Sequence, residues 1–449
     1  MSGGAGLVKS LAVIGLVLGV IGSITAWFLS FEGYLPGDAM VRTWATAKER
    51  TGDDEPNDTW VVGDVAVRSR FDAVTGFGLA DGQDGKKLWE FVPPGRTRIC
   101  GSARHAGEGV LLVAYGREGA AAGGKPGSPG EGEGCSTVLA VDTKDGRQLW
   151  SAPRTVSDGR FFGDEFLDTG GGLALIHDDR AEQVVRRPGG DRSLRALDLR
   201  TGAARWTAAV PGGCGVRDAF VGEEQVQAVL ACGGEEAGAP GSGGGGGAEM
   251  MAAAFDRGTG ALKWKVPIDA RRPVPTDSDV VVESADPLVL RVVRSSNQNA
   301  GTATGVFVPF DQDGRPGTAI ELSGDHGQID AAEVVGERMY ALAWTYAKGR
   351  HYRLIAFDLK SGEEVWNEEL DEPAAGLAVR GDRVTVLCEW STQSSAITEL
   401  LVHDARNGEE LDERHFRQEA PSGSFFEHGG TIVVAGAAGD RAFTAFERW

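Results

Sequence analysis

Two short acidic turns carry the residue types that open a calcium-binding loop. Asp311-Gln312-Asp313-Gly314 is the clearer case, and Asp81-Gly82-Gln83-Asp84-Gly85 has a similar composition. Calcium prefers carboxylate and carbonyl oxygens, but such a loop also needs a bidentate glutamate, and none follows Gly314 at the needed spacing. Both segments are also copies of a turn that repeats along the chain. We therefore interpret them as structural turns.

The other residues with catalytic potential form no recognised pattern. The seven histidines are scattered, without an HExxH sequence, and no GxSxG elbow is present. Gly243 to Gly247 lacks the lysine and hydroxyl residue of a phosphate-binding loop. His105, His177 and His428 are candidates to approach the centre of the fold, but lone histidines are more often structural. We predict no catalytic, cofactor-binding or metal-binding residue.

The five cysteines contain no CxxC and no Cys-Cys pair, which excludes the usual zinc, thioredoxin-like and haem-attachment motifs. Cys214 begins one predicted strand and Cys232 ends the next, antiparallel strand, so we expect a disulfide between them outside the cytoplasm. Cys100 and Cys135 hold related places in an earlier repeat and can close its long loop. Cys388 is left over, and we expect it to be a small buried side chain.

The charge balance excludes two classes of partner. The 449 residues carry a net charge of −20. Nucleic acid needs a basic protein face, and an anionic bilayer surface attracts basic segments. We therefore expect no nucleic-acid partner and no broad electrostatic docking on a membrane.

The N-terminus carries a candidate membrane anchor. Lys9 and Glu32 bracket 22 uncharged residues, which as a helix would reach about 33 Å and cross a hydrocarbon core. The positive-inside rule then predicts a cytoplasmic tail at 1–9, a transmembrane helix at 10–31, a linker at 32–39 and an extracytoplasmic domain at 40–449.

A cleaved signal peptide is the alternative reading of this segment. The residues Ser23-Ile24-Thr25-Ala26 make a poor cleavage site, and the apolar run is longer than usual for a signal peptide. No cysteine follows the run directly, so a lipoprotein anchor is excluded. We favour an uncleaved signal-anchor.

The rest of the chain repeats one pattern: an aspartate, a glycine four residues later and a tryptophan eight residues later. In each copy an apolar β-prone run precedes the aspartate, and the glycine suits the positive φ of a hairpin turn. Five copies are complete: Asp81, Gly85 and Trp89; Asp142, Gly146 and Trp150; Asp198, Gly202 and Trp206; Asp256, Gly260 and Trp264; Asp358, Gly362 and Trp366.

Three further copies are altered. Asp412 replaces the tryptophan after Asp404, Ile320 lies near the tryptophan position after Asp311, and Glu447 replaces the last aspartate. The copies are about 43–61 residues apart, which suits the four-stranded blades of a β-propeller. We expect each turn to join the third strand of a blade to its outer fourth strand, and each tryptophan to pack against the next blade.

The repeat resembles the tryptophan-docking motif of the pyrroloquinoline-quinone-like (PQQ-like) propellers. Residues 197–206 and 256–264 match its Asp-x-x-Thr-Gly-x-x-x-Trp pattern closely, and 358–366 differs by serine for threonine. The resemblance implies an all-β, eight-bladed propeller of four-stranded antiparallel blades, and eight repeat positions fit this number. The last copy stops at its third strand. We predict that residues 40–46, with Trp44 in the tryptophan position, complete that blade.

Two low-complexity segments, 118–134 and 233–248, fall between the second and third strands of their blades, as do 178–192 and 294–304. They are either tolerated surface insertions or a rim that faces a partner.

The resemblance also raises a quinoprotein enzyme. The dehydrogenases of the family carry an adjacent cysteine pair, a calcium site and a catalytic aspartate, and this chain has no Cys-Cys sequence. We therefore predict a non-catalytic scaffold or sensor, without cofactor, that binds a protein or ligand at a bacterial cell envelope. A PQQ-dependent oxidoreductase is the alternative.

Overall fold

The computed structural model describes residues 4–31, 39–49, 58–116, 135–154, 167–177, 193–233, 248–297, 302–345, 351–389, 396–421, 423–436 and 441–448. Three of the inserted segments lie mostly or fully outside these residues: 118–134, 178–192 and 233–248. The sequence left open whether they are surface insertions or a rim that faces a partner. The described chain is all-β apart from one α-helix and a single 3₁₀ turn, Pro94–Arg96. It divides into two compact units, residues 51–369 and residues 1–50 with 370–449.

The unit formed by residues 51–369 consists of six antiparallel sheets, and in each the strands pair in chain order. The first three sheets are β2 Thr59–Val62, β3 Val65–Ser69, β4 Val74–Gly78 and β5 Lys87–Phe91; β6 Arg98–Ser102, β7 Val110–Gly116, β8 Thr137–Asp142 and β9 Gln148–Pro153; β10 Leu167–Gly170, β11 Leu173–His177, β12 Ser193–Asp198 and β13 Ala204–Ala209.

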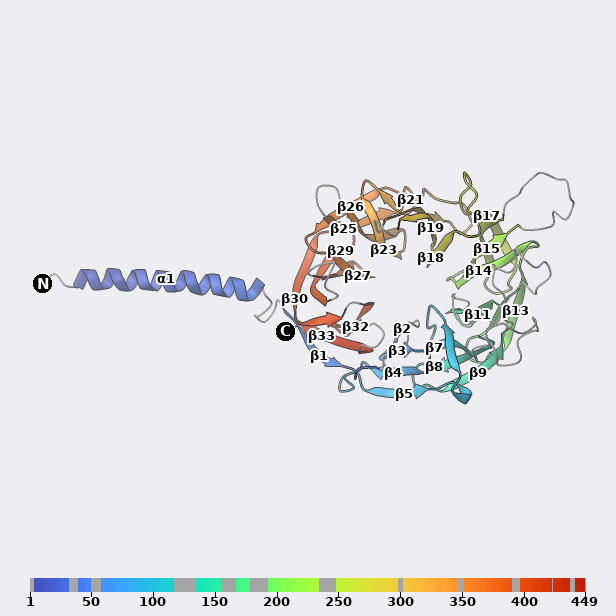
Figure 1. The fold of residues 1–449 in the computed structure, drawn as a ribbon, viewed down its shortest axis with the longest axis horizontal. Helices are drawn as coiled ribbons and strands as arrows, with labels where there is room; N and C mark the ends of the chain where they lie inside the picture. Colours follow the sequence, from blue (N-terminus) through green and yellow to red (C-terminus); the bar gives the residue numbers. More distant parts are fainter. Residues whose placement is uncertain are drawn as a thin grey trace. The chain divides into compact units, whose positions relative to one another are not determined.

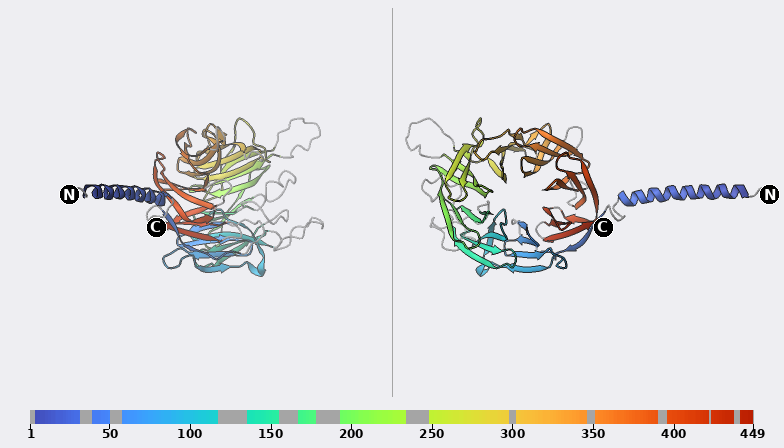
Figure 2. Two further views of the ribbon diagram at one scale, coloured as in Figure 1. Left: turned by 60° about the vertical axis from the view of Figure 1, so that its left-hand side comes forward. Right: turned by 180° about the vertical axis from the view of Figure 1, so that it is seen from behind.

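The next three sheets continue this plan, and the last gains a short extra strand at its edge. They are β14 Cys214–Val221, β15 Gln225–Cys232, β16 Glu249–Asp256 and β17 Leu262–Pro267; β18 Asp279–Ala285, β19 Leu288–Asn297, β20 Thr302–Phe310 and β21 Ile320–Glu321; β22 Ser323–Gly324, β23 Gly327–Val335, β24 Arg338–Thr345, β25 His351–Asp358 and β26 Glu364–Leu370. Within this unit the first strands lie on the inner side of an arc and the fourth strands on its outer side (Figure 1; Figure 2).

The second unit contains the helix and one eight-stranded sheet in the order β27-β28-β29-β30-β1-β33-β32-β31. Its elements are α1 Gly4–Phe31, β1 Ala39–Ala45, β27 Ala374–Arg380, β28 Arg383–Glu389, β29 Ala396–Asp404, β30 Glu410–Pro421, β31 Phe425–His428, β32 Thr431–Ala435 and β33 Phe443–Arg448.

The helix predicted for residues 10–31 is present, because α1 runs without interruption from Gly4 to Phe31 (Figure 1). Within the residues that the structure describes, no helix is both long enough and apolar enough to cross a membrane. The helix is therefore confirmed, and its predicted membrane-spanning role is not.

Apolar side chains form the core between consecutive sheets. In the middle strand β15 every residue is buried, because both faces of its sheet are covered. One cluster joins the sheets of β2–β5, β6–β9 and β10–β13, and it includes Trp89 and Trp150. Further clusters link each later sheet to the next within residues 51–369.

The repeated turn docks neighbouring sheets, as the sequence predicted. Trp150, at the start of the outer strand β9, donates its indole N–H to the Leu199 carbonyl in the next turn at 2.9 Å. The ring also covers Gly202, where a Cβ would lie 2.7 Å away. The same donation joins Trp89 to Thr143, Trp206 to Arg257 and Trp264 to Gln312.

The altered copies at Asp311 and Asp404 use different contacts. After Asp311, the residue that packs against the next turn is Thr318, whose Cγ2 lies 2.8 Å from a Cβ placed on Gly362. Ile320, which lies near the tryptophan position in the sequence, is buried at the start of β21. Asp412 forms ion pairs with Arg414 at 2.7 Å and Arg448 at 3.1 Å.

The predicted closing strand is confirmed. β1 pairs antiparallel with β33, and Trp44 lies opposite Ala445 just after a register shift. Trp150 has the same relation to Ala140, so Trp44 holds the tryptophan register of the repeat. β1 also makes a short parallel pairing with β30, which places Ala39 opposite His415.

Both predicted disulfides are present, Cys100–Cys135 and Cys214–Cys232. The second joins residues that lie directly opposite each other on β14 and β15. Cys388 is a free, buried thiol, as expected.

Candidate functional site

The acidic turn at residues 311–314 is a structural element, as we interpreted it. The Asp311 carboxylate accepts hydrogen bonds from the backbone amides of Asp313 at 2.9 Å and Arg315 at 2.8 Å. The guanidinium of Arg315 pairs with Asp313 at 2.8 Å. Gly314 lies under the ring of Trp264. The carboxylates are therefore engaged by their own turn.

The second acidic turn, residues 81–85, is also a tight turn. The Gly85 amide donates to the Gly78 carbonyl at 3.0 Å, and the ammonium of Lys86 donates to the Gly82 carbonyl at 2.9 Å.

The three histidines noted in the sequence do not form one site. His105 follows β6 and contacts Asp168 through Nδ1 at 2.9 Å. His177 is buried at the end of β11, and its carbonyl accepts a hydrogen bond from Arg154 at 3.1 Å. His428 lies at the end of β31 in the other unit. His105 and His177 thus contribute to local structure.

Charged side chains gather instead on the first strands of successive sheets in the unit 51–369. Arg104 donates a hydrogen bond to the Val282 carbonyl at 2.6 Å and lies 4.6 Å from the centre of the Phe220 ring. Asp168 on β10 is 1% exposed and accepts a hydrogen bond from the amide of Val221 on β14 at 2.8 Å. These contacts join first strands that are far apart in the sequence.

Two more acids, each partly exposed, complete this group. Glu283 on β18 pairs with Arg291 on β19 at 2.6 Å. Burial raises the pKa of Asp218 on β14 to about 8, and the charge of Arg104 opposes this increase. Charged side chains therefore bridge the inner strands, and no local pattern predicts these contacts, because each acid lies in a different repeat.

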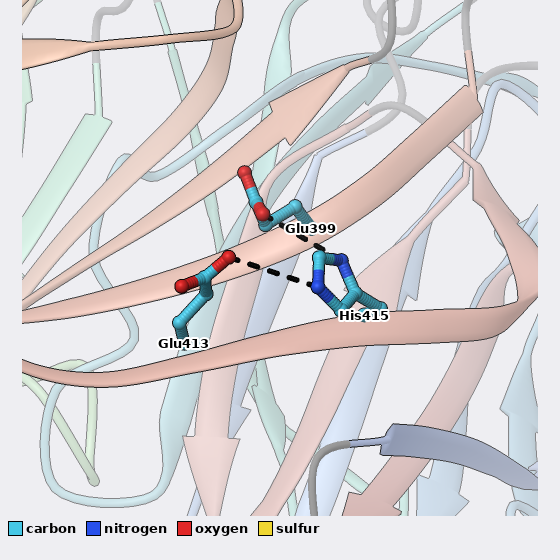
Figure 3. Close-up of side chains that lie close together, drawn as sticks. All are labelled: Glu399, Glu413 and His415. Atoms are coloured by element: carbon cyan, nitrogen blue, oxygen red, sulfur yellow. Dashed lines mark ion pairs between the residues drawn. The ribbon is translucent and has the colours of Figure 1, made fainter. Parts of the chain in front are cut away.

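The unit with both chain ends holds a compact group of Glu399, Glu413 and His415, which we call the carboxylate–histidine cluster (Figure 3). Glu399 lies on β29, and Glu413 and His415 lie two residues apart on β30. The ring nitrogens of His415 contact Glu399 at 3.6 Å and Glu413 at 3.7 Å. One potential ligand atom from each residue lies within 4.8 Å of the others.

The register of the sheet builds this cluster. Glu399 and His415 are directly opposite each other on β29 and β30. Glu413 is on the same face of β30, because residues two apart on a strand point the same way. The prediction of no metal-binding residue overlooked this group; the one sequence signal was the Glu413-Arg414-His415 alternation next to the altered Asp412 copy.

The cluster contains more acidic groups than basic groups. Burial and a hydrogen bond with Glu413 raise the pKa of the Glu399 carboxyl above its usual range. The negative charges of Glu372 and Asp371 add to this increase. The fold therefore holds the carboxyl groups of Glu399 and Glu413 close together, and the His415 ring contacts both of them.

The antiparallel four-stranded sheets and their tryptophan-docking turns define the class of the protein, a β-propeller of PQQ-like repeats. A family profile described as "Outer membrane protein assembly factor BamB" matches residues 44–335 and 248–437, and the chain belongs to this PQQ-like repeat family.

Three solved structures are similar to the chain. A computationally designed protein is 10% identical, with 92% of this chain and 100% of that chain covered and a TM-score of 0.52. BamB from Moraxella catarrhalis is 14% identical, with 90% and 99% covered and a TM-score of 0.44. A quinohemoprotein alcohol dehydrogenase from Pseudomonas putida is 11% identical, with 92% and 77% covered and a TM-score of 0.48. No curated protein sequence matches the chain significantly.

Proposed function

We propose that the chain is a non-catalytic scaffold of the cell envelope, whose propeller binds a protein partner. The observation that carries the proposal is the family match, which extends over most of the repeats and bears the description of an outer membrane assembly factor. The acidic turn at residues 311–314, which could suggest metal chemistry, engages the Asp311 carboxylate in backbone hydrogen bonds, as a structural turn does.

The proposed propeller has eight blades. Six sheets of the unit 51–369 each supply four consecutive strands, and the eight-stranded sheet of the other unit contains two further sets of four, β27–β30 and β31–β33 with β1. Eight repeat positions in the sequence agree with this number.

The proposed location is outside the cytoplasm, on an uncleaved membrane anchor. Two disulfides support an oxidising compartment. The uncharged stretch of residues 10–31 and the exposed apolar side chains of Leu16, Leu18 and Ile24 on α1 support an anchor. Membrane-associated protein should keep Met1 at its N-terminus in an intact-mass measurement. An N-terminus beyond residue 23 would show that the segment is a cleaved signal.

Site-specific crosslinking tests the scaffold. A photoreactive residue is placed in the full-length chain, in its native membrane, at one exposed position at a time, such as Leu88, Leu262, Val335 or Leu411. A scaffold with one binding face should crosslink one protein strongly from some positions and not from others. The same abundant neighbours from every position would contradict the proposal.

The competing function, a PQQ-dependent oxidoreductase, is tested separately. The full-length protein in detergent is mixed with calcium and pyrroloquinoline quinone and examined for bound chromophore and dye reduction. We expect neither, and stoichiometric binding with dye reduction would replace the scaffold by an enzyme.

A further inference from the structure

The carboxylate–histidine cluster offers a donor set that suits a metal ion. Two carboxylates and one imidazole converge from adjacent strands, and a potential ligand atom from each lies within 4.8 Å of the others (Figure 3). Rigid, paired strands hold all three, so the cluster does not depend on a flexible loop. The side chain of Glu413 is 45% exposed, whereas those of Glu399 and His415 are mostly buried, which gives an ion access from one side.

The charge around the cluster favours a cation. The carboxylates of Glu399 and Glu413 both lie beside the His415 ring, at 3.6 Å and 3.7 Å. Arg414 does not neutralise these carboxylates. It lies between Glu413 and His415 on the strand, so its side chain points to the opposite face, where it pairs with Asp412 at 2.7 Å. Carboxylates held this close together are stabilised when a cation lies between them.

A buried cysteine lies on the strand next to Glu399. Cys388 on β28 is fully buried and lies directly opposite Glu399 on β29. Cys388, Glu399 and His415 therefore form one row across three adjacent strands, but the sulfur of Cys388 does not join the three converging ligand atoms.

We propose that Glu399, Glu413 and His415 bind a divalent transition-metal ion, with zinc as the best match. Imidazole and carboxylate ligands suit zinc, whereas calcium and magnesium prefer sites made of oxygen atoms alone. A water molecule completes the coordination, and Cys388 lies behind Glu399 as its neighbour. This proposal does not depend on the proposed scaffold function.

The bound ion has a structural role. It clamps β29 to β30 where their register changes, between the pairs Ile397–Ala420 and Glu399–His415. His415 is also opposite Ala39, the first residue of the closing strand β1. The ion therefore fastens the sheet at the point where the N-terminal strand joins it.

The test is metal binding by the full-length protein in detergent. The protein is stripped with a chelator, dialysed and titrated with zinc chloride in a calorimeter, and cobalt chloride is used as a spectroscopic probe. We expect one zinc ion per chain, visible cobalt absorption that zinc abolishes, and a rise in the thermal midpoint with zinc. Calcium chloride in excess should not displace zinc.

Variants locate the site. His415→Gln and Glu413→Gln should lose the stoichiometric zinc signal. The fold should tolerate Glu413→Gln, because the side chain of Glu413 is half-exposed. The matched control is His351→Gln, which breaks an exposed pair of one histidine and one carboxylate, His351–Glu369 at 2.6 Å, and should bind zinc normally. The proposal is overturned if the unaltered protein binds no zinc, if calcium displaces zinc, or if both cluster variants keep full zinc binding.

Discussion

Gly202 lies under the ring of Trp150 in one of the docking contacts, and the change Gly202→Ala probes that contact. Gly202 has a φ of 70°, and a Cβ there would lie 2.7 Å from the ring. A left-handed conformation costs an L residue about 1–2 kcal/mol, and overpacking adds typically about 1–3 kcal/mol. We expect the free energy of unfolding to fall by about 2–5 kcal/mol.

Gly213→Ala is the matched control, because it carries the same backbone cost without the collision. Gly213 has a φ of 76°, and a Cβ there would meet no heavy atom within 4 Å. This variant should lose only about 1–2 kcal/mol. The difference between the two glycine variants measures the fit of the tryptophan against the next turn.

A double-mutant cycle completes the test. Trp150→Ala removes a buried ring and its hydrogen bond to Leu199, which should cost about 3–5 kcal/mol. In that background Gly202→Ala has no ring to collide with, so its cost should fall to that of Gly213→Ala. Unfolding of the full-length protein in urea, followed by far-ultraviolet circular dichroism, gives the four energies. Additivity within about 0.5 kcal/mol would refute the docking explanation.

Three further predictions concern other parts of the chain. Replacing Cys214 and Cys232 together by serine should lower stability by roughly 3 kcal/mol, because the bond closes a loop of 18 residues; an unchanged thermal midpoint would contradict this. The pKa of Asp218 is about 8 in the folded chain and about 3.9 in an unfolded one, so the unfolded state binds fewer protons between these values and stability should fall as pH rises through them. Asp218→Asn should flatten that fall in urea titrations at pH 5 to pH 9, and an equal slope in both proteins would argue against a buried neutral carboxyl. Amide hydrogens of β21, which pairs through only Ile320 and Glu321, should exchange faster than those of β9, measured by mass spectrometry; equal protection would show that Thr318 replaces the tryptophan fully.

The sequence predicted the repeated turns well because their determinants are local. Asp198 accepts hydrogen bonds from the amide and hydroxyl of Thr201, and Gly202 supplies the positive φ, all within five residues. Such a unit folds the same way wherever it recurs. The closing strand was also predictable, since a last repeat without a fourth strand needs one from elsewhere.

The carboxylate–histidine cluster could not be predicted in the same way. Glu399 meets His415 only because Thr398 on β29 stands opposite residues 416–419 on β30, an irregular register that no local pattern encodes. A regular hairpin would place a different residue opposite Glu399. The burial of Asp218 is likewise a product of neighbouring sheets and not of its own strand.

The pairing of β1 with β33 affects the order in which the sheets can form during synthesis. The Thr46 hydroxyl and the Phe443 amide that it contacts are 397 residues apart. A ribosome that adds 5–20 residues per second needs about 20–80 s to make that interval. During this time the sheets from β2 to β26 can form from strands that emerge one after another. The pairing of β1 with β33 therefore cannot form until these earlier sheets have had time to fold.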